Sequence, residues 1–249
     1  MFKGFYNLTS GMLSQGKRLD VISNNMANVA TAGYKADTYT DSTFREYMVS
    51  RVGNRDKSNP AEIGPASYIL APSQLYTDYT QGPLEETGMP LDFAIEGDGF
   101  FAVQAGDGVA YTRTGSFALD DEGYLCLPDG SRVLNPDGEE LLLKTDKISA
   151  DDSGAIYTEN GRLLGKIGIY SFGDNTQLQR NAQGYFTGNG AQAATGITVH
   201  WKCQERANTD LIQQMTGMIT AQRAFQSAAE VSKMYDQLMT KAATNLGNV

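Results

Sequence analysis

Apolar positions near the start of the chain recur at alternating spacings of four and three residues. Between residues 8 and 29 this spacing selects seven positions, six of them apolar, and Gly33 follows shortly afterwards. The repeat is typical of an amphipathic helix with a narrow apolar stripe, and glycine commonly ends a helix. The apolar seam of this N-terminal helix is predicted to comprise Leu8, Met12, Leu19, Ile22, Met26 and Val29.

A similar repeat occupies the end of the chain. Asn208 or Thr209 is a suitable cap there, and Asp210 lies in the expected first turn. Neither helix is stable alone in water, because most helical stability comes from burying the stripe. We expect the two stripes to bury each other as a coiled coil, although periodicity alone favours two core helices of one globular domain. The predicted C-terminal seam comprises Leu211, Met215, Met218 and Phe225.

The pattern changes in the middle of the chain to short apolar runs separated by turns. Of the 27 glycines, 18 lie between Gly82 and Gly190. Glycine interrupts helices, and Asp-Gly pairs readily adopt the positive φ angles of tight hairpins. An antiparallel β domain is therefore predicted. Its expected strands are residues 91–95, 100–104, 109–113, 116–119, 124–127, 156–158, 166–172 and 185–187.

These patterns predict an α+β fold in which an all-β central domain is inserted between two terminal helices. We expect an N-terminal assembly helix over residues 1–34, an irregular connector over 35–82, the β domain over 83–203 and a C-terminal assembly helix over 204–249. Within the connector, residues 51–60 are rich in Asn, Arg, Lys and Ser, a composition typical of a mobile segment.

Charge follows the same division of the chain. Residues 1–34 carry a net charge of +2 and residues 204–249 are neutral. Since the whole chain carries −9, the middle carries −11. This acidic balance argues against nucleic acid or an anionic membrane as a partner, because both need a basic face. No apolar run is long enough to span a membrane, and residues 1–8 lack the core of a secretory signal. We expect a chain that neither spans a membrane nor carries a cleaved signal peptide.

Candidate catalytic and metal-binding chemistry is sparse. His200 is the only histidine, and Cys126 and Cys203 lack metal-ligand spacing. No cofactor, metal or small-molecule substrate is expected. Glu96 and Asp98 could serve a hydrolase of envelope glycans, but carboxylates beside glycines are more often hairpin tips. We therefore expect a protein that is not an enzyme, with the hydrolase as the alternative.

Two glycines lie inside the predicted N-terminal helix. Gly11 and Gly16 each cost about 1 kcal/mol relative to alanine, and close approach of another backbone is one reason to keep them.

Three segments resemble the flagellar rod and hook protein family of bacteria. Residues 19–35 are similar to its N-terminal signature, residues 90–101 with 111–117 to its β-domain block, and residues 218–225 to its C-terminal helix. One departure is Ala207-Asn208-Thr209, where the family commonly has Ser-Asn-Val. The matching signature residues are Asn24, Asn25, Ala27, Asn28, Thr31, Gly33 and Tyr34, and those of the β-domain block are Leu91, Asp92, Gly97, Gly99, Phe100, Arg113, Gly115 and Phe117.

The resemblance implies a structural subunit of the basal-body rod, proximal or distal, in a tubular drive shaft required for motility. It implies terminal helices packed as an inner coiled-coil layer, with the subunit polymerised helically with itself and with other rod and hook proteins. It also implies synthesis in the cytoplasm and export to the cell envelope by the flagellar type III apparatus. A hook or hook-junction protein is the alternative, although hook subunits generally carry additional outer domains.

The asparagines of the signature have a physical interpretation of their own. Asn24, Asn25 and Asn28 carry uncharged donors and acceptors, which can pair across a subunit contact without the desolvation cost of ions. Equally, they can simply weaken the helix and end it before Gly33.

Overall fold

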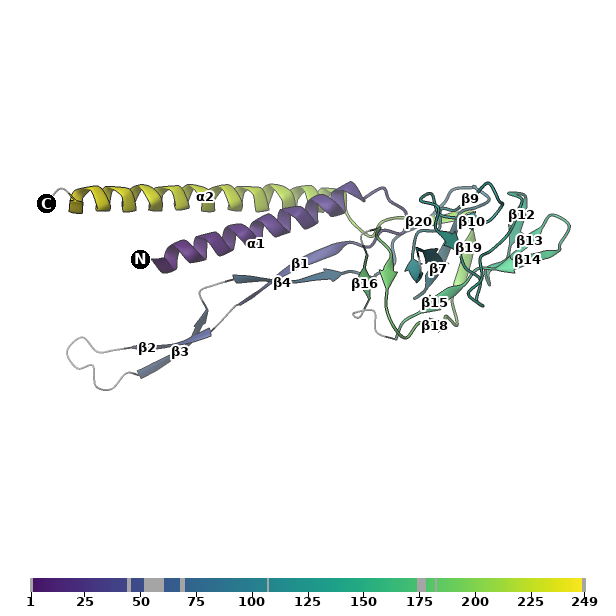
Figure 1. Ribbon diagram of the computed structural model, residues 1–249, viewed down its shortest axis with the longest axis horizontal. Helices are drawn as coiled ribbons and strands as arrows, with labels where there is room; N and C mark the ends of the chain where they lie inside the picture. The colour runs from purple at the N-terminus through teal and green to yellow at the C-terminus, as the bar shows by residue number, and fades with distance from the viewer. Residues whose placement is uncertain are drawn as a thin grey trace. The chain divides into compact units, whose positions relative to one another are not determined.

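The protein combines two long helices with a β-rich middle, as the sequence predicts (Figure 1). The structure is a computed structural model that describes residues 2–43, 46–51, 61–67, 70–106, 108–173, 178–181 and 183–247. Its contacts divide the chain into two units. A helical unit contains residues 1–27, 37–77 and 210–249, and a β unit contains residues 28–36 and 78–209.

Helices α1 (Phe2–Ala27) and α2 (Leu211–Gly247) lie side by side in the helical unit (Figure 1). Near the start of α1, a side chain on Gly4 would begin 3.4 Å from the Tyr235 hydroxyl. Near its end, Asn25 Nδ2 lies 3.5 Å from Gln214 Oε1. Early residues of α1 thus meet late residues of α2, so the pair is antiparallel.

The face of α2 that meets α1 is lined partly by small residues. Ala221 is buried, and a side chain on Gly217 would begin 3.4 Å from Ile22 Cδ1. Small residues bring the two helices close together and leave little room for larger side chains between them. The predicted seam residues that are half-buried in these helices are Leu8, Met12, Leu19, Ile22, Met26, Met218 and Phe225.

Three predicted seam residues lie elsewhere. Leu211 and Met215 are 42% and 49% exposed, because Gly217 and Ala221 turn a different face of α2 toward α1. Val29 follows the end of α1 and lies in the β unit. Within one chain these three residues do not line the contact between α1 and α2, and their place in an assembly seam stays a prediction.

The cap of α2 also differs from the expectation. The Oδ1 atom of Asp210 accepts hydrogen bonds from the backbone N–H groups of Ile212 and Gln213 at 2.8 and 3.3 Å. Asp210 itself therefore caps the helix, and its carboxylate also complements the positive end of the helix dipole. The predicted caps, Asn208 and Thr209, belong to the β unit.

The segment expected to be an irregular connector contains four strands, so that expectation is wrong. Strand β1 (Asp37–Thr43) pairs antiparallel with β4 (Leu70–Thr77), and β2 (Glu46–Arg51) pairs antiparallel with β3 (Ala61–Ser67). Thr and Tyr, which favour extended backbone, recur in β1 and allow a polar sequence to form a strand.

A contact within the helical unit attaches this segment to α1. Ser14 Oγ donates a hydrogen bond to Asp41 Oδ1 at 2.5 Å. Of the stretch expected to be mobile, residues 52–60 lie outside the described residues.

The β unit is built from short antiparallel strands in four groups. The largest sheet has the order β16-β17-β8-β7-β11-β10-β9, and β15 pairs with both β7 and β18. The other groups are β12-β13-β14, β19-β6 and β20-β5. The strands are β5 (Leu84–Glu86), β6 (Phe93–Glu96), β7 (Phe100–Ala105), β8 (Gly108–Thr112), β9 (Ala118–Leu119), β10 (Leu125–Cys126), β11 (Arg132–Val133), β12 (Ile148–Ala150), β13 (Ala155–Thr158), β14 (Leu163–Lys166), β15 (Ile169–Ser171), β16 (Gln179–Arg180), β17 (Phe186–Thr187), β18 (Gln192–Ala193), β19 (Thr198–Trp201) and β20 (Cys203–Glu205).

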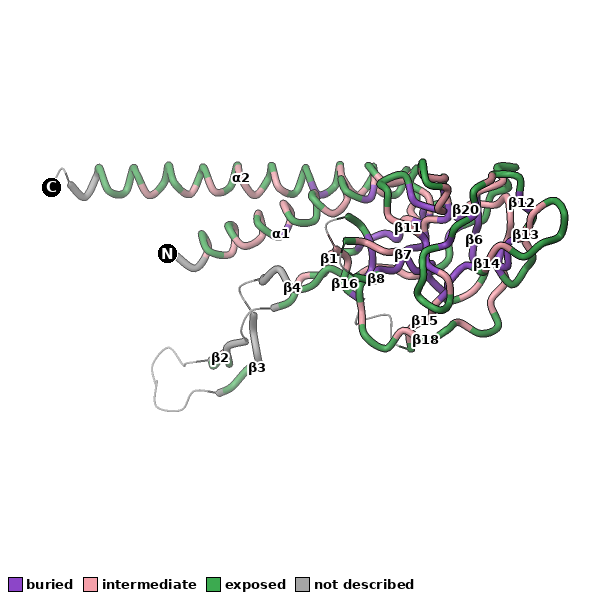
Figure 2. The backbone as a smooth tube through the Cα atoms, turned by 45° about the vertical axis from the view of Figure 1, so that its right-hand side comes forward, coloured by how far each residue is buried: buried purple, intermediate pink, exposed green. Residues whose placement is uncertain are grey.

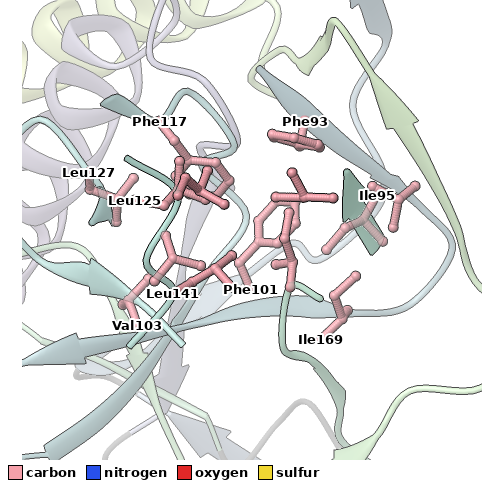
Figure 3. Close-up of a cluster of buried hydrophobic side chains, with 14 of the residues drawn as sticks. Phe93, Ile95, Phe101, Val103, Phe117, Leu125, Leu127, Leu141 and Ile169 are labelled. Atoms are coloured by element: carbon pink, nitrogen blue, oxygen red, sulfur yellow. The ribbon is translucent and has the colours of Figure 1, made fainter. Parts of the chain in front are cut away.

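Most of the buried residues lie in this unit (Figure 2). Phe93, Phe101 and Phe117 form its aromatic centre, with Phe101 edge-on to Phe117 at 5.2 Å between ring centroids (Figure 3). A second cluster is built around Phe100 and Phe186. The β unit therefore has a core of its own.

Candidate assembly site

The signature predicted from the sequence begins on the last turns of α1, where Asn25 is buried. The backbone N–H of Asp37 donates to Asn25 Oδ1 at 3.0 Å, and Asn25 Nδ2 donates to the Asp37 carbonyl at 2.8 Å. A neutral amide can satisfy both backbone groups without burying an ion. Asn25 thereby joins α1 to the first residue of β1 within one chain, whereas Asn24 is exposed.

The chain turns directly after Ala27, the last residue of α1. The Thr31 N–H donates to the Asn28 carbonyl at 3.0 Å, and Thr31 Oγ1 donates to Asn28 Oδ1 at 3.2 Å. Asn28 and Thr31 thus hold a turn at the start of the β unit. Their role in contacts between subunits stays a prediction.

Gly33 is required by both its backbone angle and its surroundings. Its φ of +64° lies in the left-handed region, and a side chain would begin 2.3 Å from the backbone of Arg113. The Gly33 N–H donates to the Glu205 carbonyl at 2.7 Å. The segment that follows α1 therefore lies against the strand that leads toward α2.

Tyr34 packs against a cation. The Arg180 guanidinium lies 5.0 Å from the centroid of the Tyr34 ring and 5.2 Å from that of Phe186. Arg180 Nη2 also donates to the Lys35 carbonyl at 2.7 Å. Arg180 thus links the signature to strand β17 by stacking and by a charged hydrogen bond.

A buried ionic network lies next to this contact. Glu205 Oε1 accepts hydrogen bonds from Lys35 Nζ at 2.7 Å and from the Gly82 N–H at 2.9 Å, and Glu205 Oε2 accepts one from Arg113 Nη1 at 3.2 Å. Lys35 also donates to the Thr80 carbonyl at 2.7 Å, and Arg113 Nη2 to the Gly97 carbonyl at 2.5 Å. We call Lys35, Arg113 and Glu205 the buried triad.

The triad holds two cations and one carboxylate away from water. Burial lowers the pKa of Lys35, and the neighbouring Glu205 carboxylate opposes that shift. Burial likewise lowers the pKa of Arg113, again opposed by Glu205. Glu205 therefore compensates the charge of both buried cations. Removing the anion from a buried pair would leave an uncompensated charge.

Asn208 adds further hydrogen bonds between these segments of the β unit. Its Oδ1 accepts from the Ala36 N–H at 2.8 Å, and its Nδ2 donates to the carbonyls of Asp78 and Thr80 at 2.8 and 3.1 Å. The residue expected to cap α2 thus bonds to three backbone groups instead. Residues 33–36 and 205–208 are held together.

The sequence pattern does not mark Lys35 or Glu205 as site residues. The available signal is the basic residue at the end of the signature, in Gly33-Tyr34-Lys35. Nothing in a single sequence pairs that residue with a carboxylate 170 positions away.

Several β-domain residues of the predicted block have structural roles. A side chain on Gly115 would begin 1.6 Å from the Phe93 carbonyl oxygen, and Gly97 has a φ of +107°. Asp92 is buried and accepts from Thr87 Oγ1 at 2.6 Å. These residues shape the sheet that supports the triad, and their part in assembly stays a prediction. Leu91, Gly99, Phe100 and Phe117 pack in or beside the two clusters of the β unit.

Of the groups considered for catalysis, Glu96 and His200 contact each other. Glu96 Oε2 lies 2.7 Å from His200 Nε2 in an exposed pair. Across the described part of the chain, no group of three or more His, Cys, Asp and Glu side chains could hold a metal ion. Cys126 and Cys203 are free thiols. Over the same residues, neither helix has a stretch apolar enough to cross a membrane.

Comparison with known protein families matches the chain in three places. Residues 5–35 match the family described as flagella basal body rod protein, and residues 94–220 match the flagellar hook protein FlgE/F/G D1 domain. Residues 204–246 match the flagellar basal body rod FlgEFG protein C-terminal family. The matched regions cover most of α1, of the β unit and of α2, and they define a flagellar axial protein.

Individual relatives align with this chain along nearly its whole length. The flagellar basal-body rod protein FlgG of Bacillus subtilis (strain 168) is 33% identical over 262 residues, covering 96% of this chain and 97% of that protein. The flagellar hook-basal body complex protein FlhO of the same strain is 29% identical over 272 residues, and the flagellar basal-body rod protein FlgF of Caulobacter vibrioides is 27% identical over 254 residues. Each of the last two alignments covers 100% of this chain and 100% of the relative. The chain belongs to the flagellar basal-body rod and hook protein family.

Proposed function

We propose that this chain is a structural subunit of the flagellar basal-body rod, polymerised helically into the axle required for motility. The relatives named as rod proteins support this role. The observation that carries it is the pair of terminal helices, which bury small residues such as Ala221 against each other and leave large apolar ones exposed. Exposed apolar faces of this kind mark sites of protein association.

The proposal gives each part of the chain a role. The terminal regions, residues 1–34 and 204–249, act as assembly helices and pack as a coiled-coil layer around the axis. The β domain over residues 83–203 lies outside that layer. The buried triad supports this division, because it joins the segment that follows α1 to the strand that precedes α2 within the β unit.

We propose further that the subunit is exported by the flagellar type III apparatus without a cleaved signal peptide. Its partners are then the export apparatus, further copies of itself and other rod and hook proteins. A structural role without catalysis is supported by the relatives named as rod proteins.

The test is complementation in a motile bacterium whose own gene for this chain has been deleted. The full chain is expected to restore swimming, and a tagged form is expected in purified basal bodies. Blocking the flagellar export apparatus should keep the chain in the cytoplasm at its full mass. Normal swimming in the deletion strain would refute the proposed role.

A further inference from the structure

An apolar hollow lies on the helical unit between α1 and α2. It encloses about 450 Å³ and is lined by Thr9, Met12, Leu13, Gly16, Lys17 and Asp20 of α1 and by Phe225 of α2. Leu13 at its edge is 53% exposed. Lys17 and Asp20 form an exposed ion pair at 3.9 Å, so the charges at the rim cancel. The hollow is thus a neutral, apolar surface.

Gly16 keeps this hollow open. A side chain built on Gly16 would meet no atom within 4 Å, and the same holds for Gly11 one and a half turns earlier. Glycine weakens a helix interior relative to alanine or leucine. The described residues of this chain therefore give no packing reason for Gly16, and a larger residue there would occupy the hollow.

The first turns of α2 carry a surface that matches the hollow. Ile212, Met215 and Ile219 are 75%, 49% and 50% exposed and are spaced at three and four residues, which places them on one helix face. Residues 211–219 contain no charged side chain. We call Ile212, Met215 and Ile219 the α2 ridge.

Resting on the proposed function, we propose that the α2 ridge of one copy docks into the Gly16 hollow of a second copy. Charge favours this occupant, because the uncharged ridge brings no ion of its own and the two charges at the rim, Lys17 and Asp20, are already paired with each other. The other exposed apolar run of α2, around Val231 and Leu238, has Lys233 and Asp236 within the same stretch of helix, whereas residues 211–219 have no charged side chain. It is therefore the poorer match.

The position of the two surfaces determines the kind of assembly. The ridge lies near the start of α2, whereas the hollow lies beside Phe225 farther along the same helix. Different patches meet in such a contact, so each copy offers a free ridge and a free hollow to the next one. Contacts of this heterologous type propagate into a polymer unless the rotation closes a ring.

Gly16→Leu tests the hollow, and Gly11→Leu is its matched control. Leucine favours helix more than glycine does, so both variants of the full chain are expected to melt at least as high as the unaltered protein by circular dichroism. In the deletion strain, G16L is expected to reduce the chain recovered in basal bodies at least tenfold and to abolish swimming. G11L is expected to assemble and swim, because Gly11 does not line the hollow.

A disulfide cross-link tests the partner directly. The full chain carrying Gly16→Cys and Met215→Cys is treated with a mild oxidant, in basal bodies and as concentrated purified protein. A ladder of linked multimers is expected, with at least tenfold fewer in the control carrying Gly11→Cys and Met215→Cys.

The outcomes separate the two proposals. If the unaltered chain restores swimming but the ladder is no stronger than in the control, the docking is refuted and the rod role stands. If the unaltered chain does not restore swimming, the rod role falls, and the ladder from purified protein alone decides the docking. Where G16L and the ladder disagree, the ladder decides, because it reports the contact itself.

Discussion

Lys35 and Glu205 meet at 2.7 Å although 170 positions separate them in the sequence, and each side chain is only 1% exposed. This ion pair joins the segment that follows the first helix to the strand that precedes the second. Two segments of the β unit that lie far apart in the sequence therefore depend on each other.

Removing the anion of the buried triad is expected to destabilise the β unit more than removing a cation. Glu205→Gln leaves Lys35 and Arg113 buried without a counter-charge and should lower the free energy of unfolding by about 3–5 kcal/mol. Lys35→Met leaves the neutral Arg113–Glu205 pair and should cost less than about half as much. Urea unfolding followed by the fluorescence of Trp201, the only tryptophan, measures both. Equal losses would contradict the assigned role of Glu205.

Gly33→Ala is expected to lower the free energy of unfolding by about 2–5 kcal/mol, from a left-handed backbone and a clash with Arg113 together. Gly138→Ala is the control, because its φ of +84° imposes the same strain while nothing lies within 4 Å of the new side chain. It should cost only about 1–2 kcal/mol. Both losses are measured by urea unfolding. If the two variants are equally stable, the close approach at Gly33 has no energetic weight.

Ile22→Asp is expected to abolish swimming while the β unit stays folded, because a carboxylate would face α2 beside Gly217. Ser23→Asp places the same charge on the exposed neighbour and should preserve swimming. Motility agar gives the first readout, and Trp201 fluorescence shows that the β unit is intact. Swimming by the Ile22 variant would exclude this face of α1 from assembly.

Stability at alkaline pH is expected to depend on Tyr185. Burial, together with its 2.5 Å hydrogen bond to Asp129, raises the pKa of Tyr185 to about 12. The unfolded chain loses this proton near pH 10, so between about pH 10 and 12 the folded state binds more protons and stability falls as pH rises. In Tyr185→Phe that fall should be shallower. Unfolding midpoints measured from pH 8 to 12 for both proteins supply the comparison.

Much of the architecture follows from local sequence. The helices are visible in the spacing of Leu8, Met12 and Leu19, and the hairpins in Asp-Gly pairs, because both depend on neighbours along the chain. The strands of residues 37–77 are less visible, since a polar strand needs only a backbone partner, which periodicity does not reveal.

The details of the site were harder to predict for a different reason. Which face of α2 meets α1 depends on the small residues Gly217 and Ala221, whereas hydrophobic periodicity gives more weight to Leu211 and Met215. The buried triad depends on contacts between distant segments, and a single sequence carries no record of such pairs. Only Gly33 and Lys35, at the end of the signature, indicate from the sequence that this segment makes a specific contact.

The distance in sequence between Lys35 and Glu205 also has a kinetic consequence. Closing a loop of 170 residues costs about 4–5 kcal/mol of chain entropy before any contact compensates for it, and folds dominated by such contacts form slowly. The β unit cannot complete its interior until Glu205 has been synthesised. A nascent chain therefore stays open for most of its synthesis, which would suit the proposed export before folding.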